Sequence, residues 1–134
     1  MLTYLVAYIS SLVLMLVLDL AWLGIVAKNL YKSALGPLLA DAPRLPPAIT
    51  FYLLYPAGVI FFAVAPALAG GSWTQALLRG ALLGFFAYMT YDFTNLALIR
   101  GWPSSIVAID IAWGVVLTAV IATAGYFAAQ WQAR

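Results

Sequence analysis

The 134-residue chain contains neither cysteine nor histidine. Without cysteine, disulfide bonds, thiolate metal sites and thiol catalysis are excluded. Without histidine, the commonest general base and the commonest metal ligand are missing. Any chemistry of this chain therefore rests on carboxylates, hydroxyls, amides and indole groups.

Charge is also scarce. Only 7% of the residues are charged, whereas 66% are hydrophobic and the mean hydropathy is +1.05. Charged residues make up about a quarter of an ordinary soluble domain, so we expect the lipid bilayer to be the main partner. The six basic residues are scattered singly. Because they form no patch that could follow a phosphate backbone, we expect no nucleic-acid partner.

Four apolar stretches are long enough to cross a bilayer, which takes about 20 residues at about 1.5 Å per residue. The stretches run over residues 3–27, 48–69, 74–99 and 104–129. The first stretch has no basic residue before Lys28 and is longer than the apolar run of a signal peptide, so we expect a retained helix. The expected fold class is an all-α integral membrane protein, a single domain over residues 1–134 with four transmembrane helices in a bundle.

The connections between these stretches predict how the chain is oriented. Residues 29–40 place leucines beside two lysines, a pattern typical of a short helix in the membrane interface between the first two spans. The basic residues of the first and third connections are Lys28, Lys32, Arg44 and Arg100. Only Arg79 and Arg134 lie on the opposite side. Since an excess of lysine and arginine marks the cytoplasmic side, we expect a multi-pass protein with both termini in the periplasm.

Small residues predict where helices pack closely. Gly80 and Gly84 are four residues apart in the third stretch, and Gly114, Thr118 and Ala122 form a similar strip in the fourth. This spacing lets helix backbones approach in a bilayer, so we interpret both strips as packing surfaces.

Three of the four acidic residues, Asp19, Asp92 and Asp110, fall inside the apolar stretches. Each costs roughly 2.5–3.5 kcal/mol at the centre of a membrane helix, so three in a short chain indicate a function. Relative to the helix centres, Asp19 lies about 6 Å, Asp92 about 8–9 Å and Asp110 about 10 Å toward the first or third connection. Both connections are on one side of the membrane. We therefore expect the three carboxylates to share one layer and one interior site.

Side chains of the same depth complete the candidate site. Trp22 and Trp113 follow Asp19 and Asp110 by three residues, so each indole shares a helix face with its carboxylate. Indole, phenol and amide groups are donors that a buried carboxylate needs. The predicted ligand-binding or proton-binding residues are Asp19, Asp92, Asp110, Asn95, Trp22, Trp113, Tyr55, Tyr88 and Tyr52.

No basic residue lies at the depth of the three aspartates to neutralise them. We therefore expect at least one aspartate to be protonated at rest, or a cation to be shared between them. The alternative is that the aspartates only hydrogen-bond neighbouring helices and fix the fold. The sequence identifies no cofactor, no metal site and no catalytic residue.

Several segments resemble a bacterial membrane-protein family catalogued as domain of unknown function 2177. They are Asp19-Leu-Ala-Trp-Leu-Gly24, Tyr31-Lys-Ser-Ala-Leu-Gly36, Phe51-Tyr-Leu-Leu-Tyr55, Tyr91-Asp-Phe-Thr-Asn-Leu96 and Asp110-Ile-Ala-Trp-Gly114. The resemblance covers nearly the whole chain. It implies a four-helix protein of the bacterial inner membrane and supplies no activity.

Three kinds of function stay open on these residues. The first is proton-coupled transport of a cation or small amphipathic molecule. Since four helices rarely enclose a pathway, transport implies a homo-oligomer, which we expect to be a dimer. The second is a membrane enzyme or a lipid-binding or isoprenoid-binding protein acting from the cytoplasmic leaflet, because paired carboxylates can serve as acid and base or hold a divalent metal. The third is a structural accessory subunit. Whether the chain catalyses a reaction is left undecided.

Overall fold

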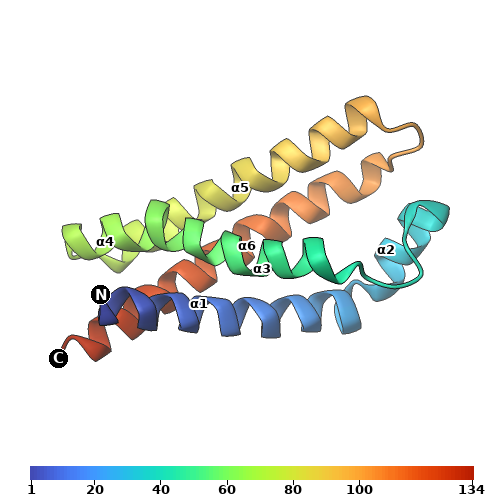
Figure 1. The fold of residues 1–134 in the computed structure, drawn as a ribbon. Helices are drawn as coiled ribbons and strands as arrows, with labels where there is room; N and C mark the ends of the chain where they lie inside the picture. The colour runs from blue at the N-terminus through green and yellow to red at the C-terminus, as the bar shows by residue number, and fades with distance from the viewer.

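The computed structural model describes all residues, 1–134, and contains helices and turns without any strand. Four long helical segments run roughly along one direction (Figure 1). In chain order they comprise α1 (Leu2–Ala21) with the π-helical turn η1 (Trp22–Val26), then α3 (Leu45–Val59) with the π-helical turn η3 (Ile60–Val64) and α4 (Ala65–Gly70), then α5 (Trp73–Leu98), and finally α6 (Ser104–Gln132). The predicted all-α fold is confirmed, and every predicted stretch is helical to within about three residues at its ends.

Three of the segments are long and apolar enough to cross a membrane, namely Leu2–Val26, Leu45–Gly70 and Ser104–Gln132. The segment α5 has a similar length but is less apolar, because it carries Arg79, Asp92 and several other polar residues. Between the first two segments lie α2 (Lys28–Leu35) and a single turn of 3₁₀ helix, η2 (Gly36–Leu38). A short helix is therefore present where the sequence predicted one.

The helices α5 and α6 form a tight antiparallel hairpin, and its contact surface is the pair of small-residue strips. A Cβ atom on Gly80 would lie 2.7 Å from the carbonyl oxygen of Thr118 and 2.8 Å from Cβ of Ala122. A Cβ atom on Gly84 would lie only 2.1 Å from the carbonyl oxygen of Gly114. Only glycine permits backbones this close, so the predicted packing role of the two strips is confirmed.

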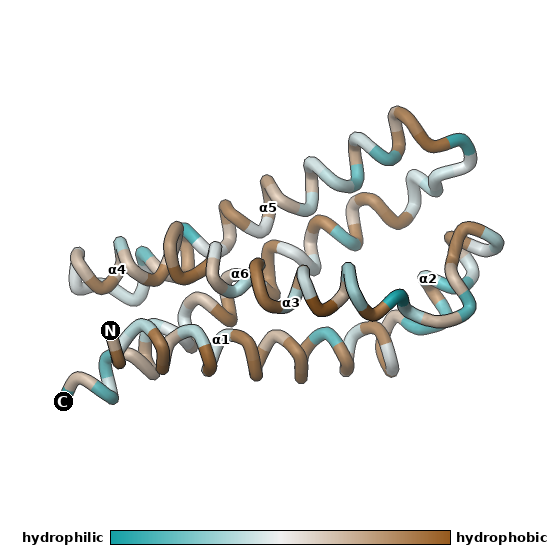
Figure 2. The backbone as a smooth tube through the Cα atoms, viewed as in Figure 1, coloured by the Kyte–Doolittle hydropathy of each residue, from teal (hydrophilic) through white to brown (hydrophobic).

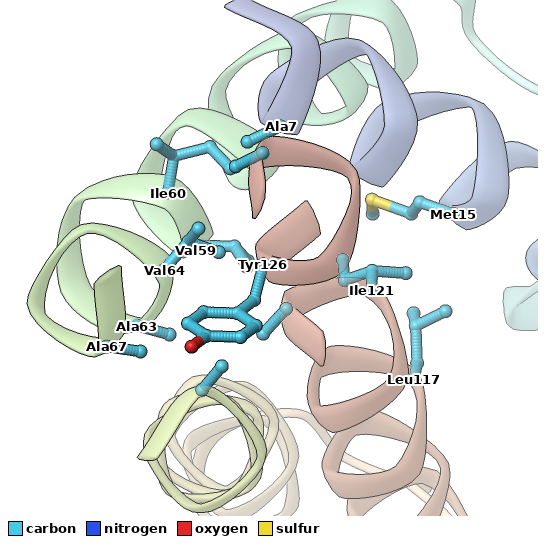
Figure 3. Packing of buried hydrophobic residues seen from close by; sticks show 13 residues of the cluster. Ala7, Met15, Val59, Ile60, Ala63, Val64, Ala67, Leu117, Ile121 and Tyr126 are labelled. Atoms are coloured by element: carbon cyan, nitrogen blue, oxygen red, sulfur yellow. The ribbon is translucent and has the colours of Figure 1, made fainter. Parts of the chain in front are cut away.

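The apolar core lies toward the end of the bundle that holds both chain termini. There the ring of Tyr126 extends from α6 toward Ala63 and Ala67, beside Val64 (Figure 3). The hydroxyl of Thr3 also donates a hydrogen bond of 2.8 Å to the side-chain oxygen of Gln132, which joins the first and last helices. This end of the molecule is closed by packed side chains.

The opposite end is open. The pair α5 and α6 diverges there from α1 and α3, and α2 lies at this wider end (Figure 1). The backbone of α5 lies close to the second segment at η3 and α4, whereas α3 meets α5 through the rings of Tyr55 and Tyr88, whose centroids are 6.4 Å apart. Hydrophilic positions appear at this end, in α2 and in the turn between α5 and α6 (Figure 2). The three aspartates lie toward this end, each of them buried.

Candidate functional site

Two adjoining cavities occupy the open end. The larger has a volume of about 720 Å³ and lies between α1, η1, α2, α3 and α6, with Tyr88 of α5 also in its wall beside Asp19 and Asp110. The smaller has a volume of about 480 Å³ and lies between α3, α5 and α6. Phe51, Tyr88 and Asp110 line both cavities, so Asp110 faces the space that they share.

Asp19 is held by two donors from other helices. The hydroxyl of Tyr52 donates to Oδ2 at 3.0 Å, and Nε1 of Trp113 donates to Oδ1 at 3.0 Å. Both carboxyl oxygens are thus satisfied, as a buried carboxylate requires. The sequence predicted all three residues for the site, and the structure brings them together.

The indole rings of Trp22 and Trp113 stack on each other. Their centroids are 4.5 Å apart and their planes differ by 4°. Nε1 of Trp22 donates to the hydroxyl of Tyr31 at 3.4 Å, and that hydroxyl donates in turn to Oδ1 of Asp110 at 2.5 Å. Burial and the hydrogen bond to Asp110 raise the pKa of Tyr31. The Tyr31 phenol therefore keeps its proton and acts as a fixed donor to Asp110.

Asp92 stands apart from the other two aspartates. Asp92 lines neither cavity and is fully buried, and neither of its carboxyl oxygens receives a hydrogen bond from the chain. Its interacting neighbour is the carboxyl group of Asp110. The three aspartates are thus arranged as one satisfied carboxylate and one pair. No group of three acidic side chains is close enough to hold a metal ion.

Three further residues that the sequence predicted for the site form no hydrogen bond with an aspartate. The hydroxyl of Tyr55 is 2.7 Å from that of Thr118, which places its hydrogen bond on α6 and not on an aspartate. Tyr88 lies in the walls of both cavities, with its ring against Gly114, where a Cβ atom would lie 2.2 Å from Cγ of the ring. Asn95 lines neither cavity and interacts with Tyr91 of its own helix.

Sequence reasoning missed Tyr31 and Phe51 as parts of the cavity wall. Tyr31 is the one residue of α2 that hydrogen-bonds an aspartate. A signal was present in the spacing, because Ala27, Tyr31 and Ala34 follow the helical repeat and share a face that excludes Lys28 and Lys32. The position of Phe51 gave no such signal, because in a helix that is apolar on all sides the spacing does not distinguish an aromatic residue that faces lipid from one that lines a cavity.

An apolar groove continues from the smaller cavity along the seam between the second segment and α5. It has a volume of about 400 Å³ and shares Phe51 and Tyr55 with that cavity. Its other lining residues are Leu54, Gly58, Phe62 and Leu83. The three spaces therefore pass from a wall with two carboxylates to a mainly aromatic wall and then to a wall of aromatic and aliphatic side chains without any carboxylate.

A family model described as "Predicted membrane protein (DUF2177)" matches residues 4–127 of the chain. No curated protein and no solved structure matches it. The family description names a membrane protein and no activity.

Proposed function

We propose that this chain, which belongs to the DUF2177 family of predicted membrane proteins, binds an amphipathic cation in the connected cavities. The observation that carries the proposal is the composition of the walls. Two carboxylates, Asp19 and Asp110, face a space lined otherwise by aromatic and aliphatic groups. All six lysine and arginine side chains are exposed, and none of them lines a cavity.

The carboxylate end suits a positively charged head group. In a setting of low dielectric constant, a negative charge without a basic partner attracts a cation more strongly than it would in water. The stacked indoles of Trp22 and Trp113 add aromatic surface beside the same carboxylates, and such surface favours cations further. A lipid-like amine or quaternary ammonium matches this wall better than a phosphate or a carboxylate does.

The groove beside Gly58 and Leu83 suits an apolar tail. It adjoins the aromatic cavity and is lined almost entirely by hydrophobic side chains. Because the backbones of α3 and α5 are not in close contact, a groove remains between these helices on the surface that we assign to lipid. A ligand would therefore reach the site from within the bilayer, with its head toward the first and third connections.

This proposal includes four membrane crossings and a defined orientation. The helix α5 packs along α6, so a bilayer that α6 spans also contains α5, although α5 is less apolar. The connections at the open end carry Lys28, Lys32, Arg44 and Arg100, and this excess of basic residues supports a position of that end and of α2 at the cytoplasmic face of the bacterial inner membrane.

The absence of native cysteine makes the orientation directly testable. We expect Ser33→Cys, in α2, to resist a membrane-impermeant maleimide in intact cells and to react after permeabilisation. We expect Ser72→Cys, in the turn before α5, to react in intact cells. Labelling in the reverse pattern would contradict the assigned orientation, and labelling of both positions in intact cells would contradict the four-span topology.

Binding can be tested with radiolabelled tetraphenylphosphonium and the purified protein in lipid nanodiscs, with empty nanodiscs as the background. We expect saturable binding, and we expect Asp19→Asn and Asp110→Asn each to weaken it by about tenfold or more, since each removes a negative charge from a water-poor wall. The matched control is Asp41→Asn, because Asp41 is exposed in a connection and lines no cavity.

A second measurement keeps the proposal testable if an aspartate variant does not fold. Hexadecyltrimethylammonium should displace the probe from the unmodified protein, whereas hexadecanol, which has the same tail without the charge, should not. Equal displacement by both compounds, or equal loss in the Asp41→Asn control, would reject a cation site.

Transport and catalysis receive less support from the geometry than binding does. Transport needs access from both sides of the membrane, and the end opposite the cavities is filled by the core around Tyr126. A transporter built from this chain would require a second conformation or a second copy, as the predicted dimer would provide. Binding at one face requires neither.

A further inference from the structure

The strongest unexplained feature of the interior is the carboxyl group of Asp92. Its residue has 0% exposure, and neither carboxyl oxygen receives a hydrogen bond from the chain. Leaving a buried polar group without a partner costs about 1–3 kcal/mol, and more when the group is charged. A residue that only stabilised the helix packing would be expected to have such a partner.

The groups around Asp92 include no positive charge. Asp110 of α6 is its interacting neighbour, and Tyr91 of the same helix lies near both carboxyls. Tyr88, also of α5, faces Asp110. From the other elements, Tyr31 of α2 faces Asp110 and Asp92, and Asp19 of α1 faces Asp110. Two adjacent carboxylates in this setting repel each other, and no lysine or arginine offsets the repulsion.

We propose that Asp92 and Asp110 hold one proton between them, which a cation entering the cavity displaces. With Asp92 protonated, its O–H donates to a carboxyl oxygen of Asp110, and Asp110 also accepts the hydrogen bond from Tyr31. This arrangement gives the orphaned carboxyl a partner and leaves the pair with a single negative charge. It divides the three aspartates into a proton-holding pair and a separate carboxylate, Asp19, that is already satisfied by Tyr52 and Trp113.

The coupling follows from the positions of the two carboxyls. Asp110 lines both cavities, whereas Asp92 lies behind it and lines neither. A cation bound against Asp110 makes a second negative charge favourable, so the O–H bond of Asp92 breaks and the proton leaves to water. The charge of the Asp92–Asp110 pair with its bound proton or cation is −1 both before and after the exchange, because one cation replaces one proton. This step rests on the proposed cation binding, whereas the shared proton does not.

Infrared spectroscopy of the purified protein without ligand tests the shared proton. We expect a protonated-carboxyl band at neutral pH that disappears in Asp92→Asn. In Asp110→Asn the band should shift in frequency, because the buried Asp92 O–H loses its carboxylate acceptor. The band should persist in Asp19→Asn, which removes a carboxyl group outside the pair. A missing band in the unmodified protein, or a band lost only in Asp19→Asn, would overturn the assignment and point to a bound metal cation or another site.

Proton release on binding tests the coupling. With an indicator dye in weak buffer, we expect one proton to be released for each tetraphenylphosphonium bound. The affinity should then rise by up to about tenfold per pH unit over the range in which Asp92 holds its proton without the probe. In Asp92→Asn the amide keeps a donor toward Asp110 but carries no exchangeable acid. This variant should bind the probe without releasing a proton and without the pH dependence.

The two proposals fail in different ways. If the carboxyl band is present but no probe binds, the cation site is wrong and the shared proton stands. If the probe binds with no proton released from the unmodified protein, the cation site stands and the exchange is wrong.

Discussion

Replacing Gly84 with alanine is expected to separate α5 from α6 and to destabilise the protein strongly. The new Cβ atom would lie 2.1 Å from the carbonyl oxygen of Gly114 and 2.7 Å from the hydroxyl oxygen of Thr118. Backbone atoms cannot rotate away as a side chain can, so α5 and α6 must move apart along the most extensive helix contact in the fold. Overpacking of this kind costs typically about 1–3 kcal/mol, and we expect the upper part of that range.

Gly58→Ala provides a matched control for this substitution. Gly58 also lies inside a helix, yet nothing stands within 4 Å of the position that a Cβ atom would take. Thermal unfolding of both variants in the same detergent should show a clear fall in midpoint for Gly84→Ala and little change for Gly58→Ala. Similar midpoints for the two variants would mean that the small-residue strips do not hold the hairpin together.

Replacing Trp113 with alanine is expected to have the largest effect on the site. The substitution removes the ring that stacks on Trp22 at 4.5 Å and the donor that satisfies Oδ1 of Asp19 at 3.0 Å. An aromatic pair contributes about 0.5–1.5 kcal/mol, and an orphaned buried acceptor costs about 1–3 kcal/mol. We therefore expect a loss of roughly 2–4 kcal/mol in the free energy of unfolding and loss of tetraphenylphosphonium binding.

Two further variants divide these contributions. Trp113→Phe keeps an aromatic ring for Trp22 but has no N–H for Asp19, so its stability should lie between those of the alanine variant and the unmodified protein. Trp131→Ala removes an indole that is 79% exposed near the C-terminus, and it should leave binding unchanged. If Trp113→Ala and Trp131→Ala lowered binding equally, Trp113 would not be part of the site.

The candidate site was predictable in part. The depth of the aspartates could be obtained by counting residues from helix centres, and the structure buries Asp19, Asp92 and Asp110 toward the same end. Their partners could not be counted in this way, because a hydrogen bond depends on how far each helix is rotated about its axis. Tyr55 and Asn95 have the correct depth and point to Thr118 and Tyr91 instead of a carboxylate.

Local features of the chain were sufficient for the helices, their ends, the strips at Gly80 and Gly84, and the layer of acidic residues. Hydropathy, residue spacing and helical rise are properties of a single segment, so the order of residues determines them directly. The tertiary structure decided the rest. The divergence of α5 and α6 from α3 opens the cavities, and the position of α2 brings Tyr31 to Asp110. Both arise from the tilt and rotation of helices that are far apart in the chain, which the packing of all four segments sets together.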